Sequence, residues 1–268
     1  NGLWNRGKIA VSGGISSDSA FSLEKLWSIN AVTGEMEYTK DGDYTLKGQI
    51  RDFEYSSKRT QSIPLYQKMF PDELPLLTYV KNFFEEYRPE GRIDIEIQAK
   101  GNFYKLQDSK LQGVIYCKSV SVSNIGFPYS IESISGKIDF TQNSYKLNGL
   151  HGKHNESVFI VSGWEKDFGD ARKYDFHVTS DAMAIDNDLY NALSADEQKM
   201  WNDFDPNGKA SLDYTVSRSS PTDKKSRIEM TLQSAQARCR YFPYPLKNLS
   251  GKLIFEKGDV IFSDIVSQ

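Results

Sequence analysis

The segment 203–214 carries the side chains best suited to chemistry in this sequence. Oxygen donors stand at its first, third, fifth and ninth positions, and a glycine stands at the sixth, as in a calcium-binding loop. These residues are Asp203, Asp205, Asn207, Ser211 and Gly208. The twelfth position should be a bidentate Glu and is Tyr214, and the related segment 86–92 has Arg88 in place of Asp205. A plain turn from helix to strand is therefore the favoured interpretation, and a metal site at Asp203, Asp205 and Asn207 is the alternative.

Other residues that could carry chemistry lack the partners that it needs. His151 and His154 lie three residues apart, and no Cys or acidic residue flanks them or His177 at ligand spacing, which predicts solvated loop histidines. No serine lies in a Gly-x-Ser-x-Gly turn, and no Gly-rich loop for phosphate opens a helix. Acidic residues such as Asp94 and Glu96 fall on a wet strand face, whereas glycosidic chemistry needs paired acids in a cleft. We assign no catalytic residue and no cofactor, and predict that the chain is not an enzyme.

The composition argues against two further classes of function. Lys and Arg total 33 against 36 Asp and Glu, a net charge of −3, and no basic tract is present to neutralise phosphates, so nucleic acid is not expected as a partner. Two cysteines so far apart in sequence form no disulfide framework. Aromatic residues make up 13% of the chain, which favours pleated sheet.

Strict alternation of apolar and polar residues predicts β-strands. Ile93, Ile95 and Ile97 share one face of such a strand, and Asp94 and Glu96 share the other. The same alternation returns at 212–216 and 228–232, and further strands are predicted at 114–122, 137–140, 157–162, 174–178 and 252–255. Turn signals at 41–43 and 257–259 predict hairpins. The pattern is typical of an antiparallel sheet with one dry face.

Two short helices interrupt the strands. The first is predicted between Pro75 and Pro89, and the second covers about 187–203. The apolar side of the first holds Leu76, Val80, Phe83, Phe84 and Tyr87, and that of the second holds Leu189, Leu193, Met200 and Trp201.

The sequence repeats itself. Segment 127–140 returns as 242–255, an offset of 115 residues, with 7 of 14 positions identical, including an initial Phe-Pro-Tyr and the glycines Gly136 and Gly251. A third copy is predicted around Gly34. Segments 65–92 and 189–209 also correspond, with an offset that falls from 124 to 117 residues because the earlier unit carries an insertion. The Phe-Pro-Tyr segments are interpreted as strand starts, where proline is tolerated.

The repeat predicts three parts. Residues 1–60 are the C-terminal part of a truncated β repeat, residues 61–165 are a complete repeat of helix, turn, strands and Phe-Pro-Tyr hairpin, and residues 166–268 are a second repeat that is truncated at its end. The chain is therefore expected to be a piece of a larger repetitive protein.

The Phe-Pro-Tyr corner, the short polar link, the Ser-Gly-led hairpin and the strand pair that follows resemble the AsmA-like, TamB-like and YhdP-like envelope proteins. The likeness covers 127–140, 242–255 and the diverged copy around Gly34. It implies a mainly β fold, an elongated, curved antiparallel sheet built from repeated units. The two short inserted helices, near 75–87 and 187–203, are where this sequence departs from the simplest version of the family. It also implies a periplasmic or envelope protein, anchored by segments not present here, that conducts phospholipid acyl chains along an apolar sheet face between inner and outer membrane.

The residues expected to line that apolar face alternate along the predicted strands. They are Ile93, Ile95, Ile97, Ile138, Phe140, Leu212, Tyr214, Val216, Ile228, Met230, Leu232, Leu253 and Phe255. The alternative for each is ordinary core, because a sheet with one apolar face must cover it with another layer or with lipid. A structural or adhesive β-repeat scaffold, closed and without lipid, is the other function kept open.

Overall fold

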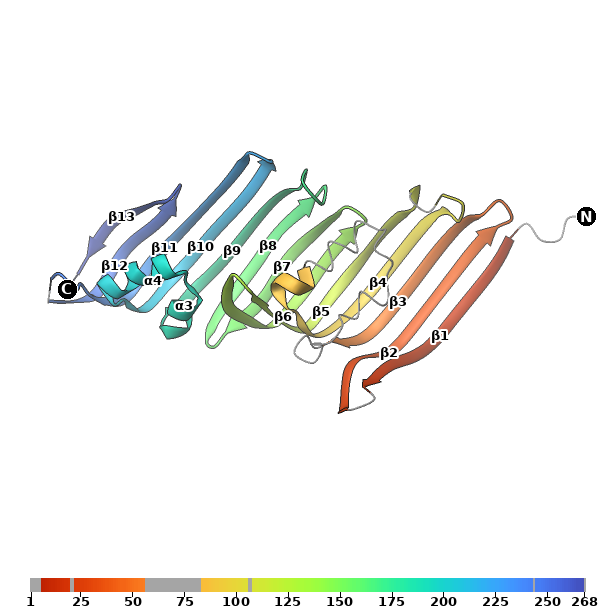
Figure 1. Cartoon of the computed structure of the whole chain (residues 1–268), viewed down its shortest axis with the longest axis horizontal. Helices are drawn as coiled ribbons and strands as arrows, with labels where there is room; N and C mark the ends of the chain where they lie inside the picture. The colour runs from red at the N-terminus through yellow and green to blue at the C-terminus, as the bar shows by residue number, and fades with distance from the viewer. Residues whose placement is uncertain (1–5, 20–21, 56–82, 106–107, 243, 268) are drawn as a thin grey trace, which may run out of the picture.

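Thirteen antiparallel strands form one sheet in which the spatial order follows the chain order (Figure 1). The computed structural model describes residues 6–19, 22–55, 83–105, 108–242 and 244–267. The strands are β1 (Arg6–Ser19), β2 (Ser22–Thr39), β3 (Asp43–Tyr55), β4 (Glu90–Asn102), β5 (Lys110–Asn124), β6 (Phe127–Thr141), β7 (Ser144–His154), β8 (Ser157–Lys166), β9 (Lys173–Ile185), β10 (Asn207–Ser220), β11 (Asp223–Arg238), β12 (Pro245–Glu256) and β13 (Asp259–Val266). The predicted mainly β fold, an elongated, curved antiparallel sheet, is confirmed.

Each strand pairs with the next because a short connection joins most of them and the alternation keeps one register. Every strand predicted from alternation lies within an observed strand. Both predicted hairpins are present, with Gly42 and Gly258 each at φ 87°. The predicted division at 60 and 165 stays a prediction, since the sheet itself runs on from strand to strand.

The inserted helical segments differ in part from expectation. Residues 83–87 are helical, and the rest of the first predicted helix, with Leu76 and Val80, lies outside the described residues. The second is two helices, α3 (Asn187–Ala192) and α4 (Ala195–Phe204). The break arises because Ser194 caps α4 through a capping box with Glu197, which leaves Leu193 extended. None of the described helices is long and apolar enough to cross a membrane.

Bulges recur from strand to strand. At each of six sites a residue with φ between 49° and 63° coincides with a shift of the pairing register. These residues are Asp52, Ser133, Gly149, Ser234, Asn248 and Asp264. A bulge bends its strand and increases the local twist, so bulges in successive strands curve the whole sheet.

The backbone repeats with the sequence. Five pairs of residues, separated by 115 or 117 positions, share left-handed conformations. The pairs are Arg88 and Asp205 (φ 43° and 42°), Gly91 and Gly208 (125° and 128°), Ser133 and Asn248 (53° and 51°), Gly136 and Gly251 (131° and 117°), and Gly149 and Asp264 (63° and 54°). Strands β4 to β7 therefore correspond to β10 to β13. Gly34, the glycine of the predicted third copy, does not share this conformation.

Two apolar clusters lie where α3 and α4 meet the sheet. The first contains Tyr129, Phe159, Met183, Leu189 and Ala192, and the second contains Ile185, Ala210, Leu232, Ala235 and Leu249. Trp201 of α4 packs against both. Met200 is 38% exposed, so its predicted place on the buried side of the helix is wrong.

Candidate functional site: the apolar face of the sheet

One face of the sheet carries an unbroken line of aliphatic side chains. Six of them are direct cross-strand partners from β2 to β7, and we call this line the isoleucine row. The row consists of Val32, Ile50, Ile95, Ile115, Ile138 and Leu147. All six are half-buried, since neighbours in the row shield each side chain but leave its tip accessible. The row continues through Gly163 and Phe176 to Val216 of β10.

A second line, which we call the glycine row, runs beside it. Gly34, Gly48, Ile97, Gly113 and Phe140 are successive cross-strand partners from β2 to β6. The ring of Phe140 lies over Gly113, where a Cβ would overlap it, and the ring of Phe176 covers Gly163 in the same way. Aromatic rings thus fill the space above the glycines and keep the face apolar. Sequence reasoning missed this row, although glycine inside a strand is a signal of close approach.

The C-terminal strands continue the same face. Tyr214, Ile228 and Phe255 form one cross-strand line, and Leu212, Met230 and Leu253 form the next. Ile93 pairs with Phe53 and Cys117, and Leu232 pairs with Ala210 and Gly251. All the residues predicted for the apolar face therefore lie on one face, which we call the apolar face. None of them is exposed, and among them Leu232 alone is buried, at 8% exposure.

The helices cover part of this face, which separates residues of the ordinary core from residues that could contact lipid. Leu212 and Met230 pack against the cluster around Leu189, and Met230 and Leu253 pack against the cluster around Leu232. Leu212, Met230, Leu232 and Leu253 are therefore ordinary core residues. In Figure 1, α3 and α4 lie over one end of the C-terminal strands and leave the rest of those strands uncovered by either helix.

Two pKa shifts report how dry the apolar face is. Burial raises the pKa of the Cys117 thiol to about 11, and burial also raises the pKa of the Tyr214 hydroxyl. Both shifts follow from desolvation, which disfavours the charged form. Cys117 and Cys239 are both free thiols.

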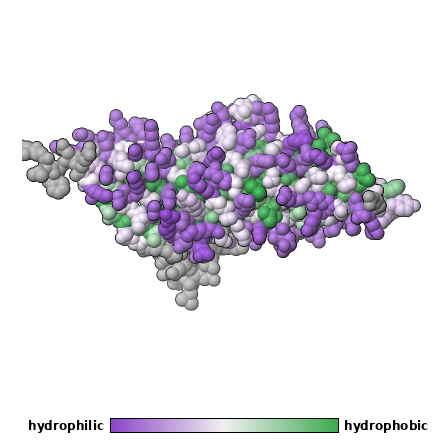
Figure 2. All heavy atoms as spheres, turned by 180° about the vertical axis from the view of Figure 1, so that it is seen from behind, coloured by the Kyte–Doolittle hydropathy of each residue, from purple (hydrophilic) through white to green (hydrophobic). Residues whose placement is uncertain are grey.

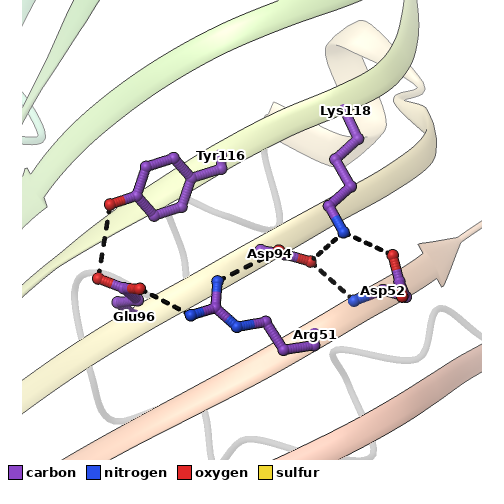
Figure 3. Close-up of polar contacts among 6 residues, drawn as sticks. All are labelled: Arg51, Asp52, Asp94, Glu96, Tyr116 and Lys118. Atoms are coloured by element: carbon purple, nitrogen blue, oxygen red, sulfur yellow. Dashed lines mark hydrogen bonds and ion pairs between the residues drawn. The ribbon is translucent and has the colours of Figure 1, made fainter.

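The opposite, polar face is held by charge pairs (Figure 3). Asp94, only 7% exposed, accepts hydrogen bonds from the Asp52 amide (2.8 Å) and from Arg51 (3.2 Å), and Lys118 lies 2.9 Å away. Burial alone would raise the pKa of Asp94, but these donors together outweigh it and lower the pKa. Arg51 also reaches Glu96 at 2.9 Å. The network fixes the bulge at Asp52, so Asp94 is a structural residue more than a member of a wet surface.

A shallow hollow of about 1050 Å³ crosses β1 to β8 on the polar face. The hollow is lined by the two residues that flank each member of the glycine row along its strand, such as Glu96 and Gln98 on either side of Ile97. The side chains of these flanking residues point to the polar face, because successive side chains of a strand alternate. Figure 2, which shows the molecule from the side away from α3 and α4, is mainly hydrophilic with smaller apolar patches. Trp164, 38% exposed, also lines this hollow.

Among the residues considered for metal binding, Asp205 has a structural role. Asp205 takes a left-handed conformation that closes α4, as Arg88 does after the helical residues 83–87. Within the described ranges, no three His, Cys, Asp or Glu side chains are arranged to hold a metal ion.

The histidines lie in strands, so their predicted place in loops is wrong. His151 and His154 belong to β7, and His177 belongs to β9. His154 stacks on Tyr129 with ring centroids 3.8 Å apart and lies 2.7 Å from the Ser130 carbonyl and 3.3 Å from Asp188 of α3. This contact ties α3 to the sheet.

The two Phe-Pro-Tyr segments differ in their packing. Phe127 begins β6 and Tyr129 is 7% exposed, which confirms the predicted strand start with packing. Phe242 and Tyr244 are 54% and 67% exposed and precede β12, so the predicted packing at the second segment is wrong. The reason is that Tyr129 packs in one cluster with Leu189 and Ala192 of α3, whereas Tyr244 belongs to neither apolar cluster.

Comparison of the chain with protein-family models, with curated proteins and with solved structures finds no significant match.

Proposed function

We propose that this chain is part of a bacterial envelope protein that binds phospholipid acyl chains along its apolar face and conducts them between inner and outer membrane. The observation that carries the proposal is the isoleucine row, a continuous aliphatic line of half-buried side chains across six strands. Acyl chains need no directional partner, so a row without polar groups suits them. The proposal involves no cofactor and no chemical step.

The length of the row suits an acyl chain. Strands in a sheet lie about 4.8 Å apart, so five spacings from β2 to β7 span about 24 Å. One leaflet of a bilayer has a hydrocarbon depth of about 15 Å, half of the core thickness. The isoleucine row is therefore long enough to contact one acyl chain over its full length. The continuation of the row through Gly163 and Phe176 to Val216 makes the apolar line longer still.

An acyl chain that leaves a bilayer needs apolar contact along its path. Each methylene group left in water costs about 0.8 kcal/mol, so ten methylenes sheltered by the row avoid up to about 8 kcal/mol.

The test uses neighbouring residues of β5 that face opposite ways. Ile115 lies in the isoleucine row, whereas Val114 lies on the polar face between Glu96 and Asp139. Both are half-buried, so Ile115→Lys and Val114→Lys are matched in size and charge. Native mass spectrometry of the purified chain with phosphatidylethanolamine vesicles measures bound lipid. We expect Ile115→Lys to lose at least ten-fold in occupancy and Val114→Lys to keep it.

Cys117 provides a second readout, because it faces Ile93 on the apolar face. A bound acyl chain should slow alkylation of Cys117 by a membrane-impermeant maleimide and leave Cys239 unchanged. Equal rates with and without vesicles, together with no lipid in the mass spectra, would reject the proposal.

A second candidate is a scaffold without lipid that binds an extended polar polymer, such as a glycan, in the hollow of the polar face. The observation that favours it is the hollow itself, lined by charged and amide side chains beside the exposed ring of Trp164. A loss of sugar binding in Trp164→Ala, with Ile115→Lys unaffected, would favour this scaffold over lipid transfer.

A further inference from the structure

We propose that the polar face of β8, together with the lysines beside it, docks onto the surface of an anionic phospholipid bilayer. Three apolar side chains of β8 are exposed on this face, and we call them the β8 stripe: Val158 (44% exposed), Ile160 (39%) and Trp164 (38%). The stripe lies on the face opposite the isoleucine row, so the proposal goes beyond the binding of acyl chains and does not depend on it.

The exposure of the β8 stripe does not arise at an edge of the sheet. β8 pairs along its length with β7 on one side and with β9 on the other, in the interior of the thirteen-stranded sheet. Phe159, which points to the other face, is buried at 4% in one cluster with Leu189 of α3. The continuous apolar run 158–161 is typical of a strand that is covered on both faces, but here the described residues cover only one of them.

Four exposed lysines surround the β8 stripe on the same face: Lys146, Lys153, Lys166 and Lys173. The ammonium nitrogen of Lys166 lies 5.3 Å from the ring centroid of Trp164, a cation–π contact that holds the ring beside a positive charge. Among the described residues, none of the four lysines forms an ion pair. Their cross-strand neighbours on β6 are Glu132 and Asp139, and Asp139 pairs with Lys137 at 2.9 Å instead.

The acidic residues of β7 to β9 do not cancel this charge. Asp175 and Asp181 of β9 stand against the four lysines, which leaves a surplus of two positive charges in a chain whose net charge is −3. The third acidic residue of these strands, Glu165, is buried and lies on the apolar face in line with Tyr145. The β8 stripe therefore lies in a basic region of an acidic chain, which complements an anionic surface.

The combination of residues favours a bilayer over a protein or a glycan. Trp is enriched at the level of the lipid head groups, and the long stem of Lys carries its charge to the phosphates without a fixed geometry. β7 to β9 contain no Arg, the residue that suits bidentate recognition of a specific carboxylate. Trp164 also lines the hollow of the polar face, but Val158, Ile160 and Lys153 lie outside its lining, so a polymer held in the hollow would not cover them.

Co-sedimentation of the full chain with vesicles measures docking. Vesicles of phosphatidylcholine with phosphatidylglycerol are compared with vesicles of phosphatidylcholine alone, at low and at high salt. We expect binding to the anionic vesicles to be about ten-fold tighter or more at low salt, and this difference to shrink at high salt, because each lysine near the surface gains from its negative potential. Ile115→Lys, which tests the apolar face, should dock as the wild type does.

Two matched double variants locate the charge. Lys166 and Lys173 are direct cross-strand partners at the ends of β8 and β9, and Lys100 and Lys110 are direct cross-strand partners at the ends of β4 and β5. Both pairs are exposed on the polar face. We expect Lys166→Glu with Lys173→Glu to weaken binding to anionic vesicles about ten-fold or more, and Lys100→Glu with Lys110→Glu to change it far less.

Single variants test the apolar part of the site. Ile160→Ser and Trp164→Ser should weaken vesicle binding, whereas Trp164→Phe should retain most of it. Ile261→Ser is the control, because Ile261 is 49% exposed on the same face of β13, away from the four lysines. Circular dichroism checks that each variant folds. Equal binding to both kinds of vesicle, equal effects of the two lysine pairs, no effect of Ile160→Ser, or loss of docking in Ile115→Lys would each overturn the proposal.

Discussion

Asp94 offers the sharpest test of how the curved sheet is held. Asp94→Asn preserves the shape of the side chain but replaces one carboxylate oxygen with an NH2 group. If the carbonyl oxygen of the new side chain still accepts the hydrogen bond from the Asp52 amide, its NH2 group takes the place of the oxygen that lies 3.2 Å from Arg51. Two hydrogen-bond donors then face each other. The ion pair of Lys118 with Asp52 at 2.6 Å and that of Arg51 with Glu96 at 2.9 Å remain, so the network is weakened but not lost.

The magnitude follows from the hydrogen bonds that change. A hydrogen bond to a charged group contributes about 1.5–3 kcal/mol, and both cations here are partly exposed, so we expect a loss of about 2 kcal/mol in the free energy of unfolding at pH 7. Asp139→Asn is the matched control. Asp139 lies on the same face and is 43% exposed beside Lys137, so its loss should cost about 0.5 kcal/mol or less.

The pH dependence supplies the refuting result. The folded pKa of Asp94 is lowered, so its stabilisation is present above the unfolded pKa of about 3.9 and is lost as pH falls through the folded pKa. Urea unfolding followed by circular dichroism at pH 7, 5, 4 and 3 should show a constant gap between wild type and Asp94→Asn above pH 5 that narrows below pH 4. A gap as large at pH 3 as at pH 7, or equal effects of Asp94→Asn and Asp139→Asn, would refute the reasoning.

Three further predictions concern the backbone and the helices, each measured by urea unfolding. Gly91→Ala should lower the free energy of unfolding by more than about 3 kcal/mol, because the φ of Gly91 is 125° and a Cβ would overlap the Ser119 carbonyl. Gly149→Ala, at φ 63° and with open space around it, should lower the free energy of unfolding by about 1 kcal/mol. Equal losses would contradict the steric argument. Ser194→Ala should remove the capping box and cost about 1 kcal/mol, and an unchanged midpoint would show that α4 needs no cap. Leu189→Ala should cost about 2–3 kcal/mol through the cavity it leaves, and hydrogen exchange should rise in α3 but not in β3.

Alternation and turn chemistry determined much of this protein locally. The run from Ile93 to Ile97 places three side chains on one face whatever the partner strands are, because successive residues of a strand point to opposite sides. The Asp-Gly and Lys-Gly turns predicted hairpins for the same local reason. The repeat of 115 residues carried over to the backbone, where Gly136 and Gly251 share a left-handed conformation.

Long-range pairing decided the rest. That Ile95, Ile115 and Ile138 form a single row depends on the register across three strands, and the bulges set that register at positions such as Asp52 that look like ordinary polar residues in sequence. The burial of Asp94 depends on Arg51 and Lys118, which arrive from two other strands. The helices decided which apolar residues are core, since Leu212 lies beneath them and Ile95 belongs to neither helix-capped cluster. Sequence thus specified the two faces of each strand, whereas the tertiary structure specified what each face meets.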